Sequence, residues 1–120
     1  MRRRRFVERT KNSLMSGFYG VIILALIDRF GPIYGYKIMK FMNEHSSGFF
    51  NPSESTIYTL LGHLEKEGLV RSFWALTGEG IPRKYYELSE KGREALEDLL
   101  GYVRSLFKAL GDILGGDVQC

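Results

Sequence analysis

Residues 53–88 read SESTIYTLLGHLEKEGLVRSFWALTGEGIPRKYYEL, and the apolar period changes halfway along this stretch. In the first half, apolar side chains recur at the three- and four-residue spacing of an α-helix, at Ile57, Leu60, Leu61 and Leu64. Ser53 is a favourable N-cap residue, and Gly68 suits the left-handed conformation in which many helices end. This half therefore predicts a helix over residues 53–67.

The second half of the stretch has the pattern of a β-hairpin. Residues 69–76 (LVRSFWAL) and residues 83–88 (RKYYEL) are rich in the aromatic and branched side chains that strands prefer. Between them, residues 77–82 (TGEGIP) supply glycine and proline. We expect two antiparallel strands joined by a glycine-rich tip.

Two further helices are expected before this stretch. Residues 14–29 contain the seven-residue apolar run VIILALI, which alone could be a buried strand. The segment around this run continues to Gly31-Pro32, and its length favours a helix. Residues 34–44 form a second helix, which Ser46-Ser47-Gly48 ends. The second helix has an apolar stripe made of Ile38, Met39 and Met42.

Ser89 is a suitable N-cap for a long last helix, which we expect to reach about Leu114. Apolar residues repeat in this helix at the seven-residue interval of a coiled-coil seam, at Leu96, Leu99, Leu100, Val103, Leu106, Phe107, Leu110 and Ile113. A stripe this wide and long is hard to bury within one small domain. We interpret it as a homodimer interface. The alternative is that it folds back on the first helix, and the two interpretations are compatible.

The order helix, helix, helix, hairpin and long helix is that of a winged helix-turn-helix with an added C-terminal dimerisation helix. The expected fold class is mainly α with a small β-hairpin. No internal repeat or linker argues for two domains. We divide the chain into a basic N-terminal arm at 1–12, a winged-helix domain at 13–88, the dimerisation helix at 89–114 and a tail at 115–120.

The composition excludes several classes of protein. The 120 residues are 44% apolar and 26% charged, as in a single globular domain. A membrane-spanning helix needs about 20 apolar residues, so we expect no membrane partner and a cytoplasmic location. One cysteine, Cys120, and two distant histidines, His45 and His63, predict neither a disulfide nor a metal site. We expect no cofactor and no enzyme activity, because no nucleophile–base set or phosphate loop is present.

The charge is distributed unevenly. Residues 1–84 hold 13 lysines or arginines and 7 acidic residues, whereas residues 85–120 hold 4 and 7. A basic front with an acidic tail suits a protein whose front meets a polyanion.

Four stretches of the chain resemble the PadR-like transcription regulators. They are LALIDRFGPIYGYKI at 24–38, SESTIYTLLGHLEKEGLV at 53–70, Trp74, and RKYYELSEKGREAL at 83–96. The resemblance implies a sequence-specific regulator of the compact branch, most simply a homodimeric repressor, that binds double-stranded DNA. Its third helix would enter the major groove, and its wing would touch the flanking backbone.

The third helix presents small polar residues opposite its apolar face. Hydroxyl groups near the start of such a helix suit base edges, and threonine methyls suit thymine methyls. Only one of two neighbouring wing residues can face DNA, because side chains alternate along a strand. The candidate DNA contacts are Ser55, Thr56, Tyr58, Thr59, His63 and Lys66 in the third helix, Tyr36 and Lys37 in the second, Arg83 and Lys84 in the wing, and Arg2, Arg3, Arg4 and Arg5 in the arm.

Several alternatives stay open from the sequence. The arm could enter a minor groove or act as a nonspecific electrostatic anchor. Tyr36 and Tyr58 could be half-buried core residues with a solvated hydroxyl. The chain could be a protein–protein interaction module, or a repressor that responds to a small molecule bound at the dimer interface. Trp74, Tyr102 and Phe107 could line such a pocket, although packing is the simpler role for them.

Overall fold

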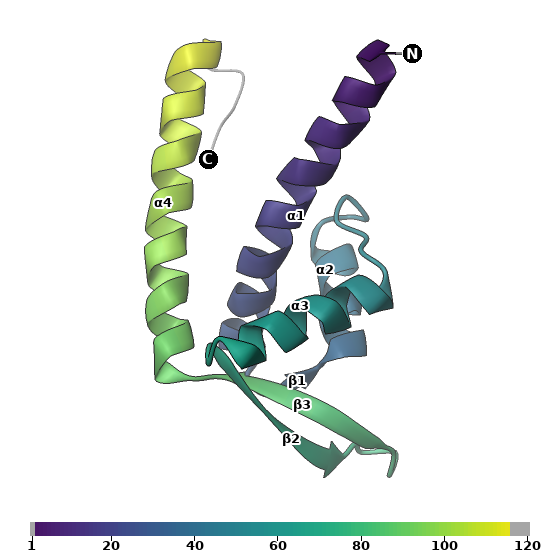
Figure 1. Cartoon of the computed structure of the whole chain (residues 1–120). Coiled ribbons are helices and arrows are strands. Elements are labelled where there is room, and N and C mark those ends of the chain that lie inside the picture. Colours follow the sequence, from purple (N-terminus) through teal and green to yellow (C-terminus); the bar gives the residue numbers. More distant parts are fainter. Residues whose placement is uncertain (1, 116–120) are drawn as a thin grey trace.

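The computed structural model describes residues 2–115, which form four helices and a three-stranded sheet (Figure 1). The order of elements confirms a winged helix-turn-helix with a long C-terminal helix. Cys120 and most of the predicted tail lie outside the described residues. The elements are α1 Arg2–Phe30, β1 Ile33–Tyr34, α2 Gly35–His45, α3 Glu54–Lys66, β2 Val70–Leu76, β3 Pro82–Leu88 and α4 Glu90–Leu114.

The first helix is longer than predicted. α1 begins at Arg2, so the segment expected to be an arm is helical and continuous with the rest of α1. Residues 2–16 contain neither glycine nor proline, and most of them are residues that favour helices. The apolar pattern begins only at Leu14, which is why the pattern alone placed the start of the helix there.

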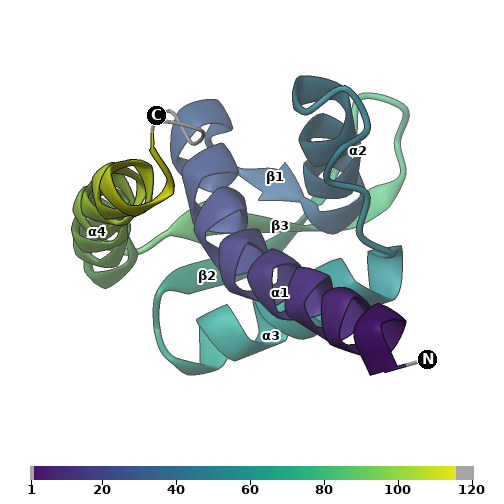
Figure 2. The ribbon, with the colours of Figure 1, turned by 90° about the horizontal axis from the view of Figure 1, so that it is seen from above.

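The hydrophobic core lies where the second half of α1 meets α2, α3 and the sheet. Seen from above, the strands lie beneath α1, with α2 and α3 on its two sides (Figure 2). The side chains that solvent reaches least come from four elements: Ile23, Leu24, Ile27, Ile38, Ile57, Leu61 and Val70. This core fixes the position of α3 under α1.

α1 is long and apolar enough, by length and composition alone, to cross a membrane. Within the domain, however, these apolar residues have other partners. Ile23, Leu24 and Ile27 are 0–1% exposed in the core, and Phe18 stacks on Phe107 of α4 with ring centroids 6.3 Å apart. The second half of α1 is thus the central helix of the core.

The sheet contains one more strand than predicted. β1 pairs antiparallel with β3, with Ile33 opposite Tyr86, and gives the strand order β1-β3-β2. A two-residue strand directly after Gly31-Pro32 is too short to show an alternating pattern. The predicted hairpin is present, with Val70 opposite Leu88 at its base.

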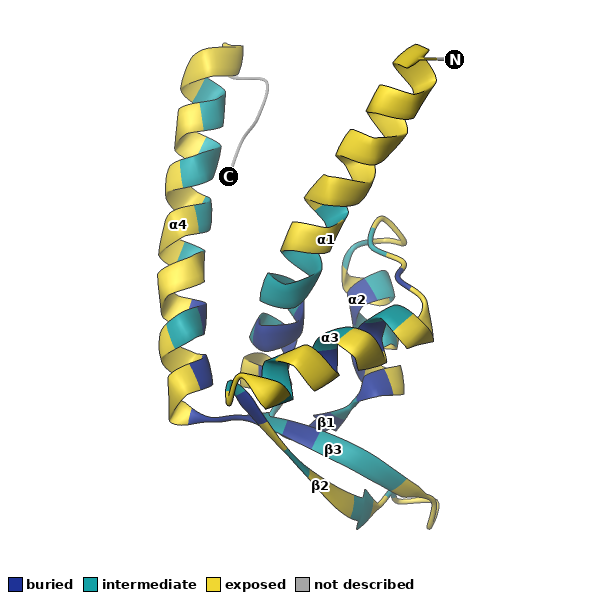
Figure 3. Ribbon diagram, in the orientation of Figure 1, coloured by how far each residue is buried: buried dark blue, intermediate teal, exposed yellow. Residues whose placement is uncertain are grey.

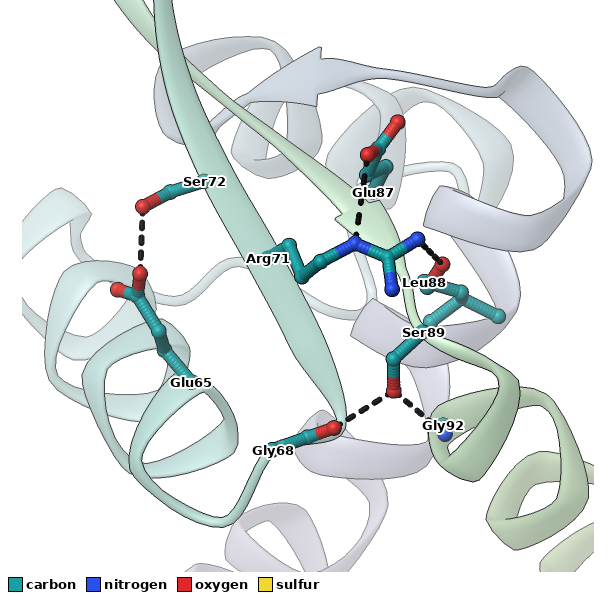
Figure 4. Close-up of polar contacts among 8 residues, drawn as sticks. All are labelled: Glu65, Gly68, Arg71, Ser72, Glu87, Leu88, Ser89 and Gly92. Atoms are coloured by element: carbon teal, nitrogen blue, oxygen red, sulfur yellow. Dashed lines mark hydrogen bonds and ion pairs between the residues drawn. The ribbon is translucent and has the colours of Figure 1, made fainter.

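A polar joint connects α3, β2 and α4 (Figure 4). The Ser89 hydroxyl donates to the Gly68 carbonyl at 2.6 Å and accepts from the Gly92 amide at 3.0 Å. A Cβ atom at Gly92 would overlap the Leu69 carbonyl oxygen. Ser89, the predicted N-cap of α4, is therefore also bonded to Gly68 at the end of α3, and this contact ties the start of α4 to the turn between α3 and β2.

α1 and α4 rise from this base and diverge toward their free ends (Figure 1). The predicted stripe of α4 faces α1 along most of its length, and burial falls along it (Figure 3). Leu96 is buried, Val103 and Phe107 are half-buried, and Ile113 is 78% exposed. The stripe does fold back on α1 near the base, whereas its free end has no cover within the described part of the chain.

Candidate nucleic-acid interface

α3 has one buried face and one exposed face, as the helical wheel predicts. Ile57 and Leu61 are fully buried in the core. The opposite face lies open to solvent and consists of Ser55, Thr59, Gly62, His63 and Lys66. Small side chains on an exposed helix of a winged-helix fold leave room for a close approach to DNA.

The hydroxyl groups at the start of α3 differ in their availability. The Ser53 hydroxyl accepts from the Thr56 amide at 3.1 Å and lies 2.9 Å from the Thr56 hydroxyl. Thr56 therefore takes part in the helix cap. Among the hydrogen bonds of residues 2–115, none involves the hydroxyl of Ser55 or Thr59, so these two are the free hydroxyls on this face.

Tyr58 packs against the start of α2. A Cβ atom at position 35 would lie only 2.6 Å from the Tyr58 ring, so this close approach requires Gly35. Tyr58 is still 39% exposed, which agrees with a packed ring and a solvated hydroxyl. Tyr36 is also partly exposed and lines a shallow hollow with Lys40 and Asn43.

The two basic residues of β3 lie on opposite faces of the sheet. The Lys84 ammonium is 3.8 Å from the Glu65 carboxylate and lies over the Tyr86 ring, so Lys84 is on the α3 side. The Arg83 guanidinium lies 5.1 Å from the centre of the Tyr34 ring on the other side. Of the pair, Lys84 therefore lies on the side of the sheet that faces α3, beside Glu65.

Lys37 lies with Arg83 rather than with α3. Its ammonium is 5.7 Å from the centre of the Phe41 ring, and it lines a hollow of about 170 Å³ with Tyr34 and Tyr85. The predicted contact residues are thus divided between two sides of the sheet.

Glu65 holds the wing against α3. It accepts a 2.5 Å hydrogen bond from Ser72 of β2 (Figure 4) and pairs with Lys84 of β3. Burial raises the pKa of the neighbouring Tyr86 hydroxyl, and the Glu65 carboxylate adds to this effect. Glu65 is therefore a bridge between two elements and not only a solvated surface charge.

A groove between α1 and α3 was missed by sequence reasoning. It has a volume of about 410 Å³ and is lined by Asn12, Met15, Ser16, Tyr19, Ser55, Thr56, Thr59 and Leu60. Asn12 and Ser16 are four residues apart and so share one side of α1. This spacing is visible in the sequence, but it becomes meaningful only once α1 is known to be helical at Asn12.

The aromatic residues considered for a ligand pocket do not gather. Trp74 is 69% exposed on β2, in the hairpin, whereas Tyr102 and Phe107 line grooves against α1. Phe107 packs on Phe18, as the simpler interpretation expects. Within residues 2–115, no group of three histidine, cysteine or acidic side chains is placed to hold a metal ion.

Comparisons with known proteins agree with this fold. The family model of the transcriptional regulator PadR-like family matches residues 23–98. A PadR family regulator from Eggerthella lenta superposes with a TM-score of 0.77 at 27% identity, covering 95% of this chain and 96% of that one. A PadR-like regulator from Bacillus cereus gives 0.76 at 30% identity, covering 88% and 99%.

A curated relative has a named role. The negative transcriptional regulator PadR of Bacillus subtilis is 32% identical over 78 residues, which are 65% of this chain and 42% of that protein. The match thus spans less than half the length of that relative. On the family match and the shared fold, the chain belongs to the PadR-like family of DNA-binding transcriptional regulators.

Proposed function

We propose that this chain is a homodimeric repressor that binds a specific double-stranded DNA sequence through the exposed face of α3. The observation that carries the proposal is the pair of free hydroxyls, Ser55 and Thr59, on the exposed side of a helix that the core holds rigidly. Hydroxyl and methyl groups at the start of a helix in the major groove contact base edges.

The other proposed contacts position α3 on the duplex. Thr56, Tyr58, His63 and Lys66 surround the two hydroxyls on α3, and Tyr36 stands at the start of α2. Lys84 supplies the basic contact from the wing, since it lies on the α3 side. Arg83 lies over the Tyr34 ring, and Lys37 lines a hollow with Tyr34 and Tyr85. Both remain predicted DNA contacts, at a place apart from the exposed face of α3.

The proposed dimer forms through the free ends of the long helices. Ile113, Leu114 and Leu14 are exposed apolar residues, and Leu14 lines a groove between α1 and α4. A second copy of the chain would cover them about a two-fold axis. Two α3 helices would then contact half-sites one helical turn apart.

Repression and a cytoplasmic site of action belong to the same proposal. Repression rests on the name of the Bacillus subtilis relative, a negative transcriptional regulator. A dimer that occupies promoter DNA represses by excluding other proteins from it.

The test is selection of binding sites from a randomised duplex library, followed by fluorescence anisotropy with the selected and a scrambled duplex at two salt concentrations. We expect a clear preference that persists at the higher salt. The double variant Ser55→Ala/Thr59→Ala should lose the preference while keeping its fold, because alanine favours helices. Ser105→Ala on α4 is the matched control.

Equal affinity of the wild-type protein for both duplexes would overturn specific recognition. Absence of binding by a folded protein would favour a protein–protein interaction module instead.

Response to a small molecule is a second candidate function. It is favoured by an apolar groove of about 410 Å³ between α1 and α4, which Phe18, Val103 and Phe107 help to line. Among residues 2–115, Arg29 is the one charged residue that lines this groove. A rise in melting temperature with apolar aromatic acids, absent in Phe107→Ala, would support this function, and no rise with any of them would count against it.

A further inference from the structure

We infer that the first half of α1 is a second DNA-binding element, which holds the phosphate backbone of the duplex beside the start of α3. The inference rests on the proposed function, because it concerns the same duplex. It adds a separate set of side chains, on another helix, and a different kind of contact.

The first half of α1 is strongly basic and unpaired. Six of the residues from Arg2 to Asn12 are basic, and only Glu8 is acidic. All of these side chains are exposed. The ion pairs found within residues 2–115 involve none of them.

The basic side chains continue a polar stripe that leads to α3. Arg5, Arg9, Asn12 and Ser16 follow one another at intervals of four, three and four residues, and so share one side of α1. Asn12 and Ser16 line the groove against Ser55 and Thr59. Arg5 and Arg9 therefore lie on the same side of α1 as this groove. They are nearer to the N-terminal end of α1, which protrudes beyond α3 (Figure 1).

The helical state of this segment is itself sensitive to anions. Its first turn contains no acidic residue, and adjacent arginines repel one another and the positive end of the helix dipole. A row of phosphates beside these turns would remove both sources of repulsion. Binding of DNA should therefore stabilise the helix over residues 2–12.

The polar groove favours nucleic acid over a lipid surface. The apolar residues of this segment, such as Val7 and Leu14, follow a different side of α1, which leads by seven-residue steps to Val21 in the groove against α4. The side with Arg5 and Arg9 leads instead to amide and hydroxyl groups on α1 and α3. Such groups bind phosphate oxygens in most protein–DNA complexes.

The test compares Arg5→Gln/Arg9→Gln with the control Arg104→Gln/Lys108→Gln, which removes the same charge from the other protruding helix. Glutamine keeps helix propensity close to that of arginine and lysine. Dissociation constants for the selected and scrambled duplexes are measured over a range of salt. We expect the first variant to weaken binding to both duplexes equally and to keep the ratio of the two affinities. The salt slope should fall by about two for each protomer, and so by nearly four for the proposed dimer.

A slope equal to that of the control would overturn the inference while leaving the proposed function intact. A wild-type protein with no preference between duplexes would instead refute the proposed function. Hydrogen exchange gives a second measurement: residues 2–12 should become protected by duplex DNA in the wild type and less so in the variant. Binding of the wild type to phosphatidylglycerol vesicles, with duplex affinity unchanged in the variant, would assign the segment to membranes and also overturn the inference.

Discussion

Each of the two long helices has one half that packs within the domain and one half that protrudes from it. The two halves differ in how far their apolar side chains are covered. In α4, Leu96 is 4% exposed near the base, whereas Ile113 is 78% exposed at the free end. In α1, Ile23 is fully buried, whereas Phe6 is 62% exposed. The apolar side chains of the two halves are of similar type, so the difference lies in the partner. Within residues 2–115, the chain itself covers those at the base but not those at the free ends.

This difference separates stability from assembly. At the base, backbone groups lie close together, and small changes there disturb the packing of several elements at once. At the free ends, a substitution removes little that holds one chain together. We therefore expect substitutions at the base to alter unfolding, and substitutions at the free ends to alter association.

The largest effect should come from Gly92→Ala at the base of α4. The added methyl group would overlap the Leu69 carbonyl oxygen, and neither backbone can move without disturbing the joint with Gly68. We expect a loss of about 3 kcal/mol or more in the free energy of unfolding, measured by chemical denaturation. Gly101→Ala, with open space around it on the same helix, should stabilise the protein by about 0.5–1 kcal/mol. Equal effects would contradict the close packing at the base.

The next largest effect should come from Ile113→Asp at the free end of α4, and it should concern association alone. A charge in the proposed seam would be buried without a partner, which is strongly unfavourable. We expect a monomer by light scattering coupled to gel filtration, with an unchanged far-ultraviolet spectrum. Ser105→Asp, on an exposed part of the same helix, should remain a dimer. A dimeric Ile113→Asp would show that the apolar end of α4 is not the interface.

The sequence predicts the features that depend on neighbouring residues and misses those that depend on contacts between distant elements. α3, the hairpin and the start of α4 depend on short-range signals, namely helical spacing, glycine-containing turns and the caps at Ser53 and Ser89, and all of these were predicted. β1 was missed, because Ile33–Tyr34 becomes a strand only through pairing with β3. Alternation along β3 predicts that Arg83 and Lys84 face opposite ways. Which side each occupies follows from Tyr86 and Leu88, which share the face of Lys84 and are buried in the core.

The candidate site was predicted only in part for the same reason. The exposed face of α3 follows from its own periodicity, so Ser55 and Thr59 were found. The contribution of Asn12 and Ser16 depends on how α1 crosses α3, and no local pattern encodes a crossing. The first turns of α1 have no apolar periodicity. In the sequence, only the absence of glycine and proline indicates that the helix extends through them.

A moderate effect is expected from Ser89→Ala, which tests the polar part of the base. The variant loses the hydrogen bond to the Gly68 carbonyl and the cap on the Gly92 amide. Because Gly92 is buried, its amide loses its partner away from water, and we expect a cost of about 1–3 kcal/mol. Ser53→Ala removes a solvent-exposed cap and should cost only about 1 kcal/mol. A larger loss from Ser53→Ala, measured by the same denaturation, would show that the joint contributes less than its burial implies.

The smallest effect concerns pH and the buried hydroxyl of Tyr86. Burial raises its pKa above the ordinary value of 10.0, with the Glu65 carboxylate and Tyr58 adding to the shift. The folded state thus disfavours ionisation of Tyr86, whereas the unfolded chain ionises near pH 10. The stabilisation is complete below that pH and is lost as the pH rises from there through the raised pKa. Tyr86→Phe should accordingly lose less stability than the wild type between about pH 8 and about pH 11, by denaturant midpoint. A Tyr86→Phe curve as steep as that of the wild type would show that the alkaline sensitivity does not come from Tyr86.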